Sequence, residues 1–123
     1  MEQQNPNETL MNAIESRDIK TILLCLENGA DVNYTRHKDE DEPNGSMQPT
    51  TPLRLVMFCI SDCLLEDDHL KQFAEIANLL LQHGADPKPA MQLAEYRYGK
   101  YDPAAEKSPF MDVWHLVASG KSR

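Results

Sequence analysis

The fold is decided by the stretch Glu75-Ile76-Ala77-Asn78-Leu79-Leu80-Leu81-Gln82-His83-Gly84-Ala85-Asp86. Its last six residues are echoed earlier in the chain by Leu26-Glu27-Asn28-Gly29-Ala30-Asp31. Before each ending, apolar residues recur at helical spacing, which places them mostly on one stripe of a helix. They are Ile19, Ile22, Leu23 and Leu26 in the first copy and Ile76, Leu79, Leu80 and Leu81 in the second. The chain therefore repeats a helix that ends at a glycine.

The glycine of each copy, Gly29 or Gly84, has a physical reason to be there. A helix end often needs one residue in the left-handed backbone conformation, which glycine adopts without a side-chain clash. We therefore expect both glycines to have left-handed backbone at the C-terminus of a helix.

A second element recurs at helix starts, as Thr51-Pro52 and Ser108-Pro109, each followed by apolar residues at helical spacing. A Thr or Ser hydroxyl can accept a hydrogen bond from an unpaired amide of the first turn. Proline loses nothing at the first helical position, where its missing N–H would be unpaired in any case. The pattern predicts helices that begin at Pro52 and Pro109.

These segments resemble the ankyrin repeat, whose signature is a Thr-Pro-Leu-His start, two antiparallel helices and a Gly-Ala-Asp turn. The start is similar to Thr51-Pro52-Leu53-Arg54, with arginine where histidine is usual. The second helix and turn are similar to residues 75–86 and again to residues 18–33. The resemblance covers roughly residues 8–33, 51–60, 73–87 and 108–119, and it implies an all-α solenoid.

The spacing departs from that family's pattern. Gly29 and Gly84 lie 55 positions apart, whereas ankyrin repeats recur about every 33 residues. We assign this excess to insertions at 34–50 and 60–72. A third insertion at 88–107 delays the next helix start and carries a short extra helix near 90–98. The expectation is one all-α domain over 1–123 with a flexible tail at 1–6. It holds two full repeats plus a C-terminal half-repeat, whose helix spans about 109–118.

Composition narrows the classes of function. The net charge is −8, from 20 acidic and 12 basic residues, so phosphate backbones repel the surface and nucleic-acid binding is not expected. A basic protein partner is compatible with this charge, although the charge can equally serve solubility alone. No apolar run approaches the roughly 20 residues of a membrane span. The polar N-terminus carries no secretion signal, so we expect a cytoplasmic, monomeric, acidic protein.

Motifs for chemistry are sparse. The sequence contains no phosphate-binding glycine loop, no nucleophile elbow and no His-Glu-x-x-His pattern. Cys59, Cys63 and His69 are conceivable metal ligands, but their spacing fits no zinc module, so two core thiols and a surface histidine are the favoured interpretation. Cys25 lies in an apolar run and is expected to be a reduced, buried thiol. His83, just before its glycine, suits a helix C-terminus. We expect no enzyme activity, cofactor or metal.

The resemblance implies a protein-interaction module that binds through projecting loops and a concave helical face. The candidate partner-binding residues are Asp39, Glu40, Asp41, Glu42, Arg54, Tyr96, Tyr98 and Tyr101. The acidic run from Asp39 to Glu42 can also be a merely solvated loop. The tyrosines can serve packing as well as an interface. The structural residues of turns and caps are Gly29, Gly84, Thr51, Pro52, Ser108 and Pro109.

Two alternatives remain. A small acidic protein of this kind could neutralise a basic toxin or enzyme, with binding that depends strongly on salt. It could also be a metal or redox protein that uses Cys59 and Cys63.

Overall fold

The computed structural model describes residues 6–35, 50–60, 66–106 and 108–120. Six helices and no β-strand are present in these residues, which confirms the all-α class. The helices are α1 (Pro6–Ser16), α2 (Ile19–Glu27), α3 (Pro52–Ile60), α4 (Asp67–Gln82), α5 (Lys88–Tyr98) and α6 (Pro109–Ser119). Among these described residues, no helix has both the length and the apolar character that crossing a membrane requires.

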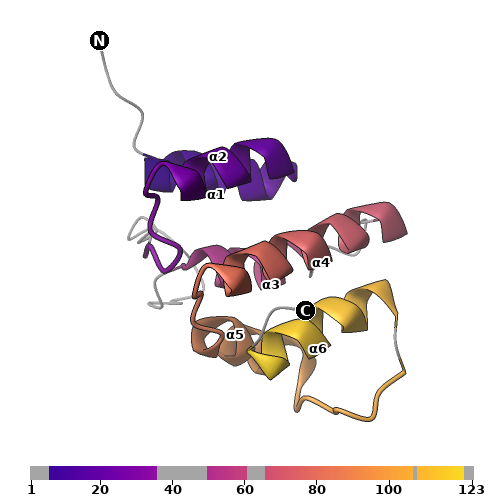
Figure 1. The fold of residues 1–123 in the computed structure, drawn as a ribbon. Coiled ribbons are helices and arrows are strands. Elements are labelled where there is room, and N and C mark those ends of the chain that lie inside the picture. Colours follow the sequence, from indigo (N-terminus) through magenta and orange to yellow (C-terminus); the bar gives the residue numbers. More distant parts are fainter. Residues whose placement is uncertain (1–5, 36–49, 61–65, 107, 121–123) are drawn as a thin grey trace, which may run out of the picture.

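The helices form three layers of two (Figure 1). The α1–α2 layer lies above α3 and α4, and α5 and α6 lie below them. Within each layer the two helices contact each other. Between layers, α3 packs against both α1 and α5, and α4 packs against α6. We call α1, α3 and α5 the first helices, and α2, α4 and α6 the second helices.

The core lies between the layers and is made of the apolar stripes of all six helices. Leu10 and Ile14 of α1, Ile76 and Leu80 of α4 and Val117 of α6 are completely buried. Burying one such side chain stabilises the fold by about 1.5–3 kcal/mol relative to leaving it in water. Of the apolar stripes read from the sequence, Ile22, Leu26, Ile76, Leu80 and Leu81 are core residues, whereas Ile19 and Leu79 are half-buried and Leu23 is exposed.

The turns after α2 and α4 have the same geometry. Gly29 and Gly84 have φ angles of +90° and +92°, the left-handed region expected from the sequence. The amide of Ala30 donates to the carbonyl of Cys25 at 2.9 Å, and the amide of Ala85 donates to that of Leu80 at 3.0 Å. These are the bonds of a Schellman motif, which satisfies carbonyls that a helix end leaves unpaired.

Asparagine side chains bond the turn after α2 to its neighbours. The Asn33 side chain accepts from the amide of Asp86 at 2.7 Å and donates to the carbonyl of Gly84 at 3.2 Å, which joins this turn to the turn after α4. Within the first layer, the Asn7 side chain of α1 accepts from the amide of Asp31 at 2.7 Å. The turn after α2 is thus bonded both to α1 and to the equivalent turn of the next layer.

Hydroxyl side chains cap α3 and α6 at the positions that the sequence indicates. The Thr51 hydroxyl accepts from the amide of Arg54 at 3.2 Å. The Ser108 hydroxyl accepts from the amide of Met111 at 3.1 Å. Each bond satisfies one amide of a first turn, which explains why these helices begin where they do.

The structure differs from the expected half-repeat at 109–118. Instead of starting a new repeat, α6 packs against the second helix α4, and α5 packs against the first helix α3. Gly120 after α6 has a φ of +67°, the counterpart of Gly29 and Gly84. The segment 88–107, expected as an insertion, therefore supplies the first helix of a third pair. Its buried residues are the small Ala90 and Ala94 with Leu93, a weak apolar signal.

The other expected insertions are shorter or lie outside the described residues. α4 already begins at Asp67, so the described part of the 60–72 segment is largely helical. Most of 34–50 and most of the 1–6 tail fall outside the described residues, while Pro6 opens α1.

Candidate interaction surface

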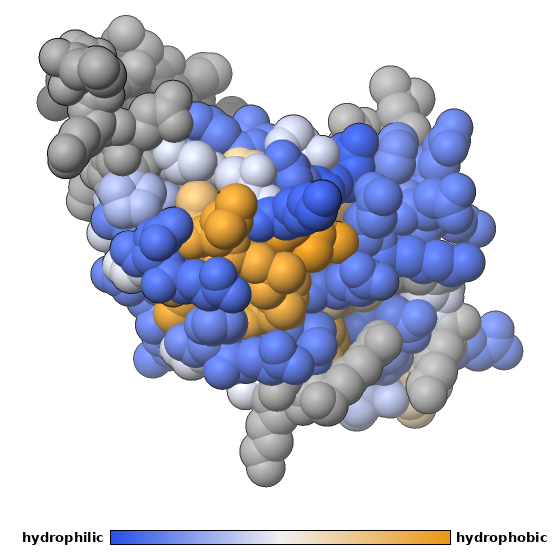
Figure 2. Space-filling model, turned by 45° about the horizontal axis from the view of Figure 1, so that its top comes forward, coloured by the Kyte–Doolittle hydropathy of each residue, from blue (hydrophilic) through white to orange (hydrophobic). Residues whose placement is uncertain are grey.

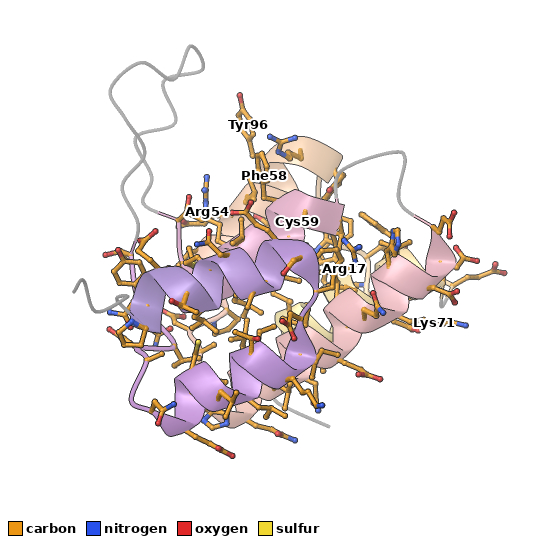
Figure 3. The ribbon with its side chains drawn as sticks, turned by 90° about the horizontal axis from the view of Figure 1, so that it is seen from above. Arg17, Arg54, Phe58, Cys59, Lys71 and Tyr96 are labelled. Carbon is orange, nitrogen blue, oxygen red and sulfur yellow. The ribbon has the colours of Figure 1, made fainter. Side chains whose placement is uncertain are left out.

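Two aromatic side chains stand out on the first helices. Phe58 on α3 is 39% exposed, and Tyr96 on α5 is 87% exposed. Figure 3 shows both side chains projecting from the same edge of the molecule. Phe58 lies near the end of α3, where it and the half-buried Cys59 are the helix residues that are not buried. Large aromatic groups left in water mark interaction sites more often than scattered aliphatic residues do.

An arginine completes this surface. The guanidinium carbon of Arg97 lies 5.0 Å from the centroid of the Phe58 ring, within the range of a cation–π interaction. The contact joins α5 to α3 and holds the exposed ring in place. We call Phe58, Tyr96 and Arg97 the aromatic–arginine patch. Tyrosine and arginine are the residue types that most often dominate binding energy at protein interfaces.

Arg54 does not lie on an exposed surface. It is only 8% exposed, and its Nη1 donates to the Thr50 hydroxyl at 3.2 Å. α3 is the middle first helix, packed against α1 and α5, so nearly all its residues up to Met57 are covered. This burial counts against Arg54 as a partner contact, because a buried guanidinium offers little surface.

Tyr98 and Tyr101 pack within the molecule. The Tyr98 ring lies 4.9 Å from that of Phe110 and 5.4 Å from that of Trp114, measured between centroids. Tyr101 lies 5.6 Å from Trp114, and its hydroxyl is 2.6 Å from Nδ1 of His115. Both tyrosines are half-buried and fasten α6 to α5 and the segment that follows it. They are packing residues, whereas Tyr96 is the exposed member of the three.

His115 is held from both sides of its ring. Its Nε2 lies 3.2 Å from the carbonyl of Ala105, which can only accept a hydrogen bond. Nε2 is therefore the donor in this bond, and in the neutral ring Nδ1 accepts from the Tyr101 hydroxyl. Through its two ring nitrogens, His115 therefore links α6 to the segment that precedes it.

The acidic run Asp39, Glu40, Asp41 and Glu42 lies outside the described residues, as do His37 and Cys63. The proposed roles of this run remain predictions from sequence. Within the described ranges, no group of three or more His, Cys, Asp or Glu residues is arranged to hold a metal.

The described thiols differ in environment. Cys25 is a buried free thiol of α2, and burial raises its pKa. Less of it is thiolate at neutral pH, which makes it less reactive. Cys59 is half-buried and follows Phe58 in α3. His83 is the C-cap residue of α4, as its place before the glycine suggests.

Phe58 is the surface residue that sequence reasoning missed. It ends the run Leu53-Arg54-Leu55-Val56-Met57-Phe58, in which apolar residues occupy every side of the helix. Such a run does not reveal which side faces water. Its only signal is position, since Phe58 falls opposite Leu53 on a helical wheel while Leu53, Val56 and Met57 share the core side.

Comparison of the sequence with protein-family models gives no match. Searches of curated proteins and of solved structures give no match either.

Proposed function

We propose that this chain is a protein-interaction module built as a short ankyrin-type stack. It binds a protein partner through the aromatic–arginine patch of its first helices. The observation that carries the proposal is the exposure of Phe58 and Tyr96 on neighbouring helices, with Arg97 set against the Phe58 ring. Binding at such a site needs no catalytic group, metal or cofactor.

The ankyrin part of the proposal is supported by the repeated local geometry. The same glycine turn follows two second helices, and the Asn33 side chain joins the two turns. Each layer pairs a first with a second helix, and layers stack like on like in α1, α3 and α5. Solenoids of this kind expose an extended surface made from equivalent elements of successive repeats.

The chemistry of the patch suggests what a partner presents to it. Phe58 and Tyr96 suit an apolar side chain that fits between or against two rings. Arg97 suits a neighbouring carboxylate or carbonyl oxygen. The net charge of −8 favours a partner that is basic overall. The two preferences are compatible because net charge steers approach over distance, while the patch makes local contacts.

The neutraliser alternative rests on the small size and overall acidity of the chain, which do not say which surface binds. The metal or redox alternative needs Cys63 together with Cys59, and Cys63 lies outside the described residues. We therefore keep the patch-binding module as the leading proposal.

Site-specific photo-cross-linking tests it directly. In the test variant, a benzophenone amino acid replaces Tyr96, and the variant is expressed in the cells from which the protein comes. In the matched control, the same amino acid replaces Glu75, an exposed residue of the second helix α4. We expect a discrete protein adduct from position 96 that is absent from position 75. Equal cross-linking at both positions, or adducts only at position 75, would contradict the patch.

Variants then separate binding from folding. Tyr96→Ala should change the free energy of unfolding by less than about 0.5 kcal/mol, because the side chain is exposed. It should weaken binding to the cross-linked partner by about 10-fold or more if Tyr96 is an anchor. Lys71→Ala is the control: Figure 3 shows Lys71 on α4, away from Phe58 and Tyr96, and its affinity should equal that of the parent protein.

A further inference from the structure

The outer side of α2 carries an exposed stripe of mixed character. Lys20, Leu23, Leu24 and Glu27 occupy positions i, i+3, i+4 and i+7, which fall on one side of a helix. All four are exposed, Leu24 by 57% and Leu23 by 36%. In Figure 2 the top of the molecule, where the α1–α2 layer lies, is turned toward the reader. Hydrophobic side chains gather in the middle of this face and are bordered by hydrophilic ones. Two adjacent leucines thus lie in water between two opposite charges.

The equivalent positions of α4 have a different composition. Counted back from the glycine turn, they are Glu75, Asn78, Leu79 and Gln82. The one apolar member, Leu79, is half-buried and not exposed. The exposed leucines of α2 are therefore not a requirement of the turn or of the second-helix position.

The charges of the α2 stripe have the opposite signs to those that the helix macrodipole favours at each end. Lys20 lies in the first turn and Glu27 is the last residue, whereas a helix favours acidic groups at its N-terminus and basic groups at its C-terminus. Neither side chain forms an ion pair with the described residues. Lys20 does help to lower the pKa of Asp18, but less than the hydrogen bonds from Thr21 do. Helix stability therefore does not account for this arrangement.

We propose that the α2 stripe docks against the same stripe of a second copy of this chain. Lys20 and Glu27 are equidistant from the bond between Leu23 and Leu24. A two-fold axis at that point sets α2 antiparallel to its copy, with leucines in the centre. It also sets each Lys20 against Glu27 of the other chain, twice per dimer. Such self-complementarity is what a two-fold interface requires.

The interface is small and separate from the aromatic–arginine patch, so this inference does not depend on the proposed function. Two leucines per chain bury little area, which places the dimer among weak, reversible associations. It differs from the monomer expected from sequence, where Leu23 is assigned to the core stripe.

Sedimentation velocity of the purified chain tests whether the dimer forms. Across concentrations from about 1 µM to about 1 mM, which cover weak to moderate dissociation constants, the mass should rise from monomer toward dimer. Leu24→Ser should weaken dimerisation about 10-fold or more, because it removes a leucine from the interface centre. A monomeric mass at every concentration, or a dimer that Leu24→Ser leaves unchanged, would overturn the proposal.

Charge variants test the antiparallel register. Lys20→Glu and Glu27→Lys should each weaken dimerisation about 3- to 10-fold, because like charges then face each other twice. Mixing the two variants should restore association, since each then presents the charge that the other lacks. The double variant Lys20→Glu with Glu27→Lys should also dimerise like the parent. The control is Lys71→Glu, which changes the net charge as Lys20→Glu does and should have little effect.

The melting temperature separates folding from docking in these variants. Lys20→Glu and Glu27→Lys both favour the helix macrodipole, so neither should lower it. If mixing fails to restore association, or if Lys71→Glu weakens it as much as Lys20→Glu does, the stripe is not the interface.

Discussion

The second helices α2 and α4 end in the same turn but differ in their N-terminal caps and in their outer surfaces. Both close with a glycine at positive φ and a bond from the following alanine amide back to the helix. α2 begins at a side-chain cap from Asp18, whereas Glu66 before α4 makes no such bond. The outer stripe of α2 exposes two leucines, and that of α4 is polar. The backbone geometry of the turn repeats because the fold requires it, whereas the exposed side chains can differ according to what each surface contacts.

The largest difference between the two helices should appear in their cores. Leu80 and Cys25 are equivalent, since each carbonyl accepts the amide that closes the turn. Leu80→Ala should lower the free energy of unfolding by about 3 kcal/mol through lost burial and a residual cavity. Cys25→Ala should lower it by about 1 kcal/mol or less, because less volume is removed. Urea denaturation measures both, and equal losses would show that the two positions are not packed as described.

The shared turn predicts a shared penalty. Gly84→Val and Gly29→Val should each lower the free energy of unfolding by at least about 1 kcal/mol, because a side chain disfavours left-handed backbone. Apart from the glycine and its two chain neighbours, no atom lies within 4 Å of the position where a Cβ would be, so the cost is conformational and not a clash with a packed group. Gly84→Asn should cost less, as asparagine tolerates this region. An unchanged melting temperature for Gly84→Val would contradict the turn assignment.

The different N-termini predict a difference in pH dependence. Hydrogen bonds from the side chain and then the backbone of Thr21 hold the pKa of Asp18 below its usual value of 3.8. A depressed pKa adds stability that is present above the unfolded pKa and is lost as the pH falls through the folded one. The melting temperature of the parent protein should therefore fall more below about pH 4 than that of Asp18→Asn. Glu66→Gln should follow the parent curve, and a matching deviation in that variant would refute the assignment.

The smallest expected effect concerns the turn between α1 and α2. Arg17 has a φ of +58° without being glycine, and its Nε donates to the Gln72 side chain at 3.1 Å. Arg17→Gly relieves backbone strain but adds freedom to the unfolded chain and loses that bond. The net change should stay within about 0.5 kcal/mol, since these terms oppose each other. A loss as large as that of Gly84→Val would mean that the Arg17 side chain, and not the backbone, controls the turn.

Much of the helical framework can be predicted from sequence, because its signals are local. Gly29, Gly84, Thr51 and Ser108 mark helix ends through backbone conformation and hydrogen bonds that involve only near neighbours. The sequence predicts α5 only as an extra helix, since Ala90 and Ala94 pack as small residues and give little apolar signal. Its pairing with α3 depends on contacts between distant segments, which spacing alone does not reveal.

The candidate surface is less predictable for the same reason. Among the three tyrosines of one segment, Tyr96 is exposed while Tyr98 and Tyr101 are packed against Trp114. That division depends on where α6 lies, a tertiary fact. Arg54 is buried and Phe58 is exposed because α3 is flanked by α1 and α5, which no pattern within 52–60 indicates.

The most direct test of the proposed function is the kinetics of binding to the cross-linked partner at two salt concentrations. Tyr96→Ala and Phe58→Ser should dissociate about 10-fold faster or more, with association nearly unchanged, as expected for buried anchors. Neutralising Asp39, Glu40, Asp41 and Glu42 together should instead slow association and flatten its salt dependence, if that run steers the encounter. Parent-like dissociation of both aromatic variants would contradict the patch as the binding surface.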